Sequence, residues 1–312
     1  QRVAASVPAR YTGDRLALSA AAPIDGATTL FPRITLFRDS RTLRFAGADT
    51  GASGADASLR LIHQGQWQVD ALGWVQMRDF SNVVISSTSF RPTLDQRATP
   101  TTGWGGKIEL RPPVPGHSSV RLGIDVRGAS GAAIEDSIVA ATGRRSLTRR
   151  AGGRNLVFGG FAEADLARGP LAITLGGRID QWRQSGGFLS EVRADGTTQT
   201  DLHYAERSGT IGSARAAATL HLTRQIDLRA SAYSGFRIPT LNELYRGFTV
   251  FPVVTRANPA LTPERLRGAE AGIDWRPHDG TLFSITAFTN RLDDAIANVT
   301  IGPNLRERRN VD

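Results

Sequence analysis

Arginine is the residue type whose spacing in this chain most clearly indicates binding chemistry. Several arginines stand close together in one stretch, and their planar guanidinium groups bind carboxylate or phosphate in bidentate fashion. The hypothesis is a site for an anionic ligand, and the alternatives are contact with anionic lipid or simple solvation. These arginines are Arg144, Arg145, Arg149, Arg150 and Arg154, which we expect in one connection between two strands.

Two neighbouring pairs of polar residues are further candidates. His203 and Tyr204 supply an imidazole and a phenol, which suit the edge of a site for a metal chelate, with solvation as the alternative. They are expected in a long loop from Ser185 to Gly209. Elsewhere, Asp293-Asp294 is the best carboxylate pair for general acid and base catalysis, with a solvated acidic pair as the alternative.

The sequence lacks the usual signatures of enzymes and metal sites. There is no cysteine, which excludes disulfides, iron–sulfur clusters and cysteine nucleophiles. The five histidines are scattered without the spacing of a zinc enzyme, and neither GxSxG nor a phosphate-binding P-loop occurs. The run Gly152-Gly153-Arg154 is expected at a loop tip. We therefore predict no catalytic residue, no metal site and no cofactor.

The charge of the chain is basic but dispersed. The formal net charge is +9, and Lys107 is the only lysine, so nearly all positive charge is arginine. Basic residues alternate with apolar ones and form no stripe, so no nucleic-acid partner is expected. No apolar run approaches the roughly 18 residues of a transmembrane helix.

The elements that must position these residues follow a period of two. From Leu171 to Ile179 the odd positions are apolar or glycine, which is typical of a strand with one apolar face. Short and long connections alternate along the chain, and charged residues lie deep on the polar faces. These features predict an all-β, antiparallel transmembrane β-barrel sector of the up-and-down type, with short periplasmic turns and long extracellular loops. A soluble β-sandwich is the alternative.

The register of two turns supports one continuous sheet. If Ala167 faces Pro170 across a two-residue turn at Arg168 and Gly169, the apolar face passes from even to odd positions, as observed in the sequence. A three-residue connection at 223–225 leaves the apolar face on even positions. The apolar residues then stay on one side of the sheet throughout.

Aromatic residues are expected near both membrane interfaces. Trp67 and Trp275 fall at the turn-side ends of strands with outward parity, while Phe158 and Phe236 fall at the loop-side ends. Such positions suit aromatic girdles, and plain packing is the alternative for each residue.

Three motifs stand in order in the last quarter of the chain. The first runs from Ser234 to Tyr245 and reads SGFRIPTLNELY, the second runs from Asn258 to Glu264 and reads NPALTPE, and the third runs from Asn290 to Ile296 and reads NRLDDAI. Together they closely resemble the late-barrel motifs of TonB-dependent outer-membrane receptors. Matching residues are interpreted as structural: Phe236, Arg237, Pro239, Asn242, Glu243, Asn258, Pro259, Pro263, Glu264, Asp293 and Asp294.

This resemblance implies a partial barrel domain over residues 1–312. Barrels of the family have 22 strands, so about 13 strands counted from Leu16, the last beginning near Asn304, correspond to strands eight to twenty. The plug domain, the early strands and the last strands are then missing.

The implied function is active transport in the outer membrane of a Gram-negative bacterium. The expected cargo is a ferric siderophore, with cobalamin, haem or glycans as alternatives, and the expected partners are the TonB complex, acting through the plug, and outer-membrane lipid and lipopolysaccharide. The clustered arginines then become a funnel for an anionic siderophore or a contact for lipopolysaccharide. An ungated porin or adhesin is the alternative function, and an outer-membrane hydrolase is a further one.

Overall fold

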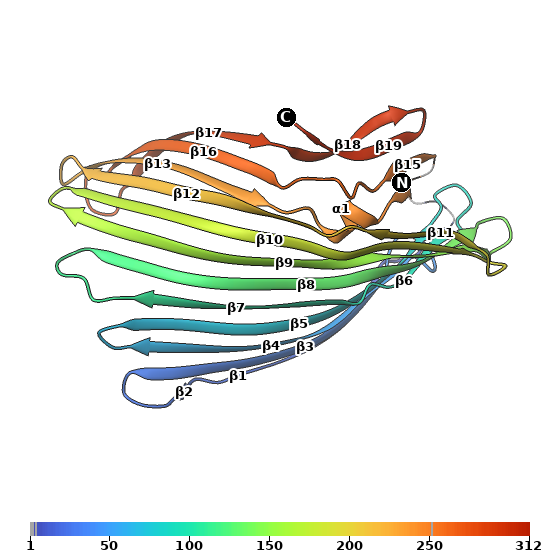
Figure 1. The fold of residues 1–312 in the computed structure, drawn as a ribbon, viewed down its shortest axis with the longest axis horizontal. Helices are drawn as coiled ribbons and strands as arrows, with labels where there is room; N and C mark the ends of the chain where they lie inside the picture. Colours follow the sequence, from blue (N-terminus) through green and yellow to red (C-terminus); the bar gives the residue numbers. More distant parts are fainter. Residues whose placement is uncertain (1–2, 4, 251) are drawn as a thin grey trace.

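The computed structural model describes residues 3, 5–250 and 252–312, and it is almost entirely β (Figure 1). Its strands are β1 (Arg10–Ser19), β2 (Ala22–Pro23), β3 (Thr28–Thr42), β4 (Asp49–Gln64), β5 (Gln68–Ile85), β6 (Pro92–Ala98), β7 (Thr101–Arg111), β8 (Ser119–Val139), β9 (Arg144–Arg168), β10 (Leu171–Arg193), β11 (Thr198–Tyr204), β12 (Arg207–His221), β13 (Ile226–Arg237), β14 (Phe248–Val250), β15 (Val253–Arg256), β16 (Glu264–Trp275), β17 (Phe283–Asp293), β18 (Ala295–Gly302) and β19 (Leu305–Val311). One short helix, α1 (Leu241–Tyr245), lies between β13 and β14.

The strands form a large antiparallel sheet and a small second sheet. Among the described residues the large sheet has 15 strands in the order β1-β3-β4-β5-β6-β8-β9-β10-β12-β13-β16-β17, with β2, β7 and β11 pairing beside this path. Figure 1 shows the long strands curving side by side from β1 to β17, which are the two edges. The predicted all-β antiparallel architecture is confirmed. No helix in the described ranges is long and apolar enough to cross a membrane.

One expected barrel strand lies elsewhere. The strand predicted from about Asn304 is β19, which pairs with β15 and β18 in a four-stranded sheet, so its placement in the barrel sheet is wrong. The chain leaves β17 at Asp294, where the backbone turns through a positive φ of 56°. The following hairpin lies at the loop end, beside β15 (Figure 1).

The two faces of the large sheet differ as the period of two requires. We call the face on which α1 lies the inner face, and the opposite one the outer face. On β9 the inner-face Val157 is buried, whereas the outer-face Phe158 is 51% exposed. On β10 the outer-face Ile179 is 66% exposed, while the inner-face Asp180 is fully buried. Apolar side chains therefore cover the outer face and polar ones the inner face.

The turns match the predicted face changes. Leu171 pairs with Arg168, so the two-residue turn consists of Gly169 and Pro170, one residue later than predicted, and the face still changes parity. Gly169 has a φ of 59°, which suits glycine in such a turn. After β12, Leu220 pairs with Leu228 across the predicted three-residue connection.

Candidate functional site

A long connection between β13 and β16 folds back inside the loop end of the sheet. It contains α1, whose first turn is closed by a reciprocal capping box between Thr240 and Glu243. Helix α1 packs against β9 and β10, and its Leu244 and Tyr245 are buried together with Leu261. We call this connection, residues 238–263, the rim segment.

Arg237 joins the three sequence motifs at the base of the rim segment. Its guanidinium donates to Glu264 at 2.5 Å and to Glu243 at 2.8 Å. The second oxygen of Glu264 accepts from the backbone N–H of Ile296 at 2.6 Å. The backbone N–H of Asn258 donates to the carbonyl of Glu243 at 3.2 Å. Residues distant in the sequence thus form one hydrogen-bonded cluster, which we call the Arg237 cluster.

Burial shifts the pKa values of two charged groups in and beside the Arg237 cluster, Glu243 and Arg308. Burial raises the pKa of the Glu243 carboxyl, but hydrogen bonds from Arg237 and Thr240 together outweigh burial and hold that pKa below its ordinary value. Burial lowers the pKa of Arg308, which donates to the carbonyl of Arg246 at 2.9 Å. Both side chains bond the backbone of the rim segment, Glu243 at the N–H of Thr240 and Arg308 at the carbonyl of Arg246.

Pro239 has a positional role in the rim segment. Its buried carbonyl accepts from the side-chain amide of Gln184 at 3.1 Å and from that of Asn155 at 3.5 Å. Phe236, expected in an outer aromatic girdle, packs instead against a buried cluster that includes Val157 and Trp182. This packing occurs where the backbone pairing of β13 with β12 has ended, beyond Tyr233.

The remaining motif residues also lie in or beside the rim segment. Asn242 accepts at its carbonyl from Arg308, and Pro259 accepts at its carbonyl from Arg207 at 2.8 Å. Pro263 is buried next to Glu264 at the start of β16. These contacts are intramolecular, in keeping with the structural interpretation.

The five clustered arginines do not lie in a loop. All belong to β9, which continues pairing with β8 and β10 beyond the apolar band, so the predicted connection is wrong. Gly152 and Gly153 are likewise strand residues, paired with Ala132 and Gly131 of β8, and not a loop tip. Because strand residues alternate between faces, Arg149 points to the inner face and bonds Glu191 at 2.8 Å. Arg144 and Arg145 are exposed at the start of β9, while Arg150 and Arg154 are exposed on its outer face.

His203 and Tyr204 lie on a strand, not in a loop. They end β11, which pairs with the upper part of β10. The His203 side chain is 81% exposed. Tyr204 instead stacks on Tyr245 with ring centroids 5.2 Å apart. A Cβ atom at Gly153 would come within 2.8 Å of the Tyr245 ring, so glycine there makes room for this stack.

Asp293 and Asp294 have different surroundings. Asp293 ends β17 and accepts from Arg291 at 2.5 Å, whereas Asp294 forms the turn that follows. The two carboxylates share no hydrogen bond among the described residues.

Ion pairs across neighbouring strands cover the inner face of the wall. Arg178 bonds Asp180 at 2.6 Å and Asp125 at 3.1 Å. Glu163 forms ion pairs with Arg121 and Arg215 on the strands to either side. This network places paired charges deep in the strands, as expected for a wall around a wet interior.

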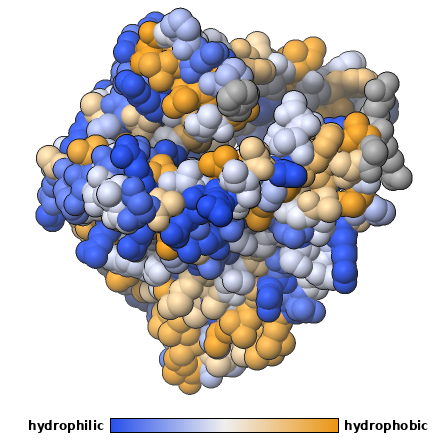
Figure 2. Space-filling view, turned by 90° about the vertical axis from the view of Figure 1, so that its right-hand side faces the viewer, coloured by the Kyte–Doolittle hydropathy of each residue, from blue (hydrophilic) through white to orange (hydrophobic). Residues whose placement is uncertain are grey.

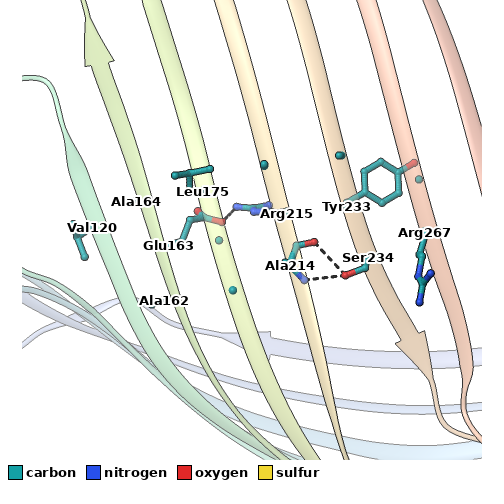
Figure 3. A pocket seen from close by; sticks show the side chains of 15 residues that line it. Val120, Ala162, Glu163, Ala164, Leu175, Ala214, Arg215, Tyr233, Ser234 and Arg267 are labelled. Atoms are coloured by element: carbon teal, nitrogen blue, oxygen red, sulfur yellow. Dashed lines mark hydrogen bonds and ion pairs between the residues drawn. The ribbon is translucent and has the colours of Figure 1, made fainter.

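A trough of 780 Å³ marks the wall near the point where β12 and β13 separate (Figure 3). Small residues of the five strands β9, β10, β12, β13 and β16 line it, and the lining also includes the Glu163–Arg215 ion pair. The Ser234 hydroxyl accepts from the N–H of Ala214 at 2.9 Å and donates to its carbonyl at 3.4 Å, which joins the strands where backbone pairing ends.

Three further arginines of this region escaped the sequence reasoning. Arg246 pairs with the buried Glu135 on β8, Arg207 donates to the carbonyl of Leu261 at 2.7 Å, and Arg308 caps the end of α1. Their partners are mostly backbone carbonyls or lie over 100 residues away, as for Glu135. No local motif marks such pairings.

Known proteins share the sequence pattern and the architecture of this chain. Residues 5–311 match the family model described as TonB dependent receptor-like, beta-barrel. The chain belongs to this family of TonB-dependent receptor β-barrels. Members are receptors and transporters of the bacterial outer membrane. A search of curated proteins finds no match.

Solved structures of similar fold include metal and siderophore transporters. The copper transporter OprC superposes with a TM-score of 0.73 at 15% identity, over 98% of this chain and 49% of OprC. The ferric-catecholate import receptor Fiu from E. coli K12, in its closed form, gives 0.71 at 11% identity, over 99% of this chain and 54% of Fiu. The ferric yersiniabactin receptor FyuA from Yersinia pestis gives 0.67 at 11% identity, over 92% of this chain and 46% of FyuA. This TonB-dependent receptor chain thus spans about half the length of these proteins.

Proposed function

We propose that this chain is the wall of an outer-membrane receptor that takes up a large, scarce nutrient, with a ferric siderophore as the cargo and the TonB complex as the energy source. The observation that carries the proposal is the family match over residues 5–311, together with an inner face of paired charges. The named cargoes of OprC, Fiu and FyuA are metals or iron chelates, which supports this cargo class.

The structure narrows the residues proposed to contact the cargo. Arg144, Arg145 and His203 are exposed at the loop end, where an arriving anionic chelate first meets the protein. Figure 2 looks onto this end and displays extensive hydrophilic surface there. Tyr204 contributes indirectly, because its ring stacks on Tyr245 and joins β11 to the rim segment. Arg149 serves by holding Glu191 and the upper hairpin.

Growth of a deletion strain tests the proposal. A strain lacking the complete gene is grown on a panel of iron chelates, each as the sole source of iron, and on cobalamin as the sole source of that vitamin. The strain is also complemented with the intact gene. We expect loss of growth on one ferric siderophore and restoration by the gene only in cells with an active TonB complex. Growth that does not depend on TonB would instead indicate the ungated porin or adhesin, and unchanged growth on every source would contradict the transport proposal.

A further inference from the structure

Two connections at the loop end of the wall are joined to each other by backbone pairing (Figure 1). One is the rim segment, and the other is the hairpin of β18 and β19 that follows β17. Strands β15 and β19 run parallel, with Thr255 opposite Arg306. The side-chain amide of Asn310 adds a hydrogen bond to the N–H and another to the carbonyl of Thr262, at 2.9 and 3.0 Å. We call the rim segment and this hairpin together the composite lid.

The composite lid is attached to the wall in a different way. Among the described residues, no strand of the four-stranded sheet pairs with the large sheet. The hydrogen bonds that these residues make between the rim segment and β6, β8, β9, β10 or β12 all use a side chain of the wall or of the rim segment. Local opening in proteins occurs in cooperative units that often coincide with supersecondary motifs. The composite lid can therefore leave the wall as one body with its own backbone pairing intact.

Under the rim segment, one row of polar residues crosses five strands in register. Gln96 of β6 stands opposite Glu135 of β8, which stands opposite Arg149 of β9. Arg149 in turn stands opposite Glu191 of β10, which stands opposite Thr200 of β11. Because residues directly opposite each other in a sheet share a face, all five point to the inner face. We call them the polar row.

The charges of the polar row balance when the composite lid is in place. Glu135 and Glu191 are 2% and 8% exposed, and Arg149 is the single cation of the row. Arg246 of the rim segment supplies a second cation through an ion pair with Glu135, and it donates to the side-chain carbonyl of Gln96 at 3.3 Å. A buried carboxylate that loses its counter-ion is destabilising, so the dry polar row holds Arg246 in position.

The contact of Arg246 with Glu135 lies across the wall from the points where the composite lid joins the strands. The rim segment leaves β13 after Arg237 and returns to β16 at Glu264, while the hairpin leaves β17 at Asp294 with a φ of 56°. Glu135 belongs to β8, and β9, β10 and β12 lie between β8 and β13 in the sheet. The attachment points are therefore on one side and the ion pair is on the other.

We propose that the composite lid is a hinged cover, which turns about the ends of β13, β16 and β17, and that the Arg246–Glu135 ion pair is the latch that holds it against β8. When the latch opens, water reaches the polar row and hydrates Glu135, so the carboxylate is no longer buried without a partner. The open lid uncovers the polar row and widens the loop-end entrance. The role of this entrance in uptake rests on the proposed function, whereas the movement itself does not.

Distances between spin labels test the composite lid in the full-length receptor in lipid, without cargo or TonB. A label at Leu156→Cys on β9 marks the wall. The second label is placed either at Thr249→Cys on β14 or at Asn298→Cys on β18, which are exposed positions in the two halves of the lid. Any cysteine outside residues 1–312 is first replaced by serine.

The latch variants are Glu135→Gln and Arg246→Gln, and the matched control is Asp136→Asn. Asp136 is adjacent to Glu135 but bonds Arg97 and Thr148 on the opposite face of the sheet. Circular dichroism and heat-modifiable migration verify that each variant is folded. If Glu135→Gln does not fold, Arg246→Gln decides the test alone, because its side chain belongs to the rim segment and not to the barrel sheet.

We expect each folded latch variant to show a population of longer lid-to-wall distances at least five-fold larger than that of the parent protein, and the control to match the parent. The two lid labels should give the same fraction of longer distances, while hydrogen exchange within β15 and β19 stays unchanged. Parent-like distances in a folded latch variant would overturn the latch, and longer distances at one lid label only would overturn the composite lid. Because neither cargo nor TonB is present, these outcomes are separate from those of the growth test.

Discussion

The inner and outer faces of the β8–β13 wall carry side chains of opposite character. Inside, Arg178 lies between Asp125 and Asp180, so its charge is neutralised within the chain. Outside, Leu175 and Ile179 on the same strand are exposed and apolar. The comparison indicates that each face is matched to a different medium, with water and other protein groups inside and lipid outside. The predictions below test this difference.

The largest effect is expected from removing the shared inner-face cation. Arg178→Ala leaves the fully buried Asp180 without its counter-ion, while Asp125 keeps only the more distant Arg127 at 3.6 Å. We expect a loss of about 3–5 kcal/mol in the free energy of unfolding, measured in urea with the full-length receptor. The double variant Arg178→Ala with Asp180→Ala should recover part of this loss. A change below about 0.5 kcal/mol in the single variant would contradict the role of the network.

The adjacent outer-face position sharpens the comparison. Ile179→Arg places a charge in the middle of the apolar belt, where we expect a loss of about 2–4 kcal/mol in the free energy of unfolding in lipid. Ile179→Leu is the matched control and should change little. If the arginine variant were as stable as the leucine variant, this position would not face hydrocarbon.

The wall itself was predictable because a period of two is local. Leu171, Ile173 and Leu175 establish which side is apolar before any partner strand is known, and the turn after Arg168 preserves that assignment even when its position is off by one residue. The error does not matter for the faces, because the predicted pairing of Ala167 with Pro170 and the observed pairing of Arg168 with Leu171 both move the apolar face from even to odd positions.

The rim was less predictable because strands continue beyond the membrane. Gly152 and Gly153 are typical of a loop, yet they belong to β9 and pair with β8, and Gly153 makes room for the Tyr245 ring. The motifs contain Arg237, Glu243 and Glu264, but no local pattern shows that these three side chains pair, and the way the rim segment folds inward depends on distant contacts.

A moderate loss of local stability is expected when the Arg237 cluster at the base of the rim segment is broken. Arg237→Gln removes the ion pairs to Glu243 and Glu264, so α1 should open more often than the wall strands. We expect about 1–3 kcal/mol less protection of α1 amides in hydrogen exchange, with the wall unaffected. Arg224→Gln, in an exposed turn, is the control. Equal exchange of the α1 amides in both variants would contradict the stabilisation of α1 by the Arg237 cluster.

The smallest effect is a pH dependence confined to the rim. Because the folded-state pKa of Glu243 lies below its ordinary value of 4.5, its ionised form stabilises the fold above that value, and this contribution is lost as the pH falls through the lowered pKa. Hydrogen exchange of α1 should therefore accelerate below about pH 4 relative to the wall. Glu243→Gln should remove this acid dependence, and an unchanged acid response in that variant would assign it to another group.

The most direct test of the account uses two adjacent alanines of β12. Ala216 pairs with the outer-face Leu175, and Ala217 pairs with the inner-face Thr174. Because residues 1–312 contain no cysteine, Ala216→Cys and Ala217→Cys each place one labelling site in this part of the receptor, and any cysteine elsewhere in the full-length receptor is replaced by serine before spin labelling in lipid. We expect the label at 216 to collide with dissolved oxygen more than with a water-soluble nickel complex, and the label at 217 to give the lower oxygen-to-nickel ratio. The same ratio at both positions would contradict a wall with lipid on one side only.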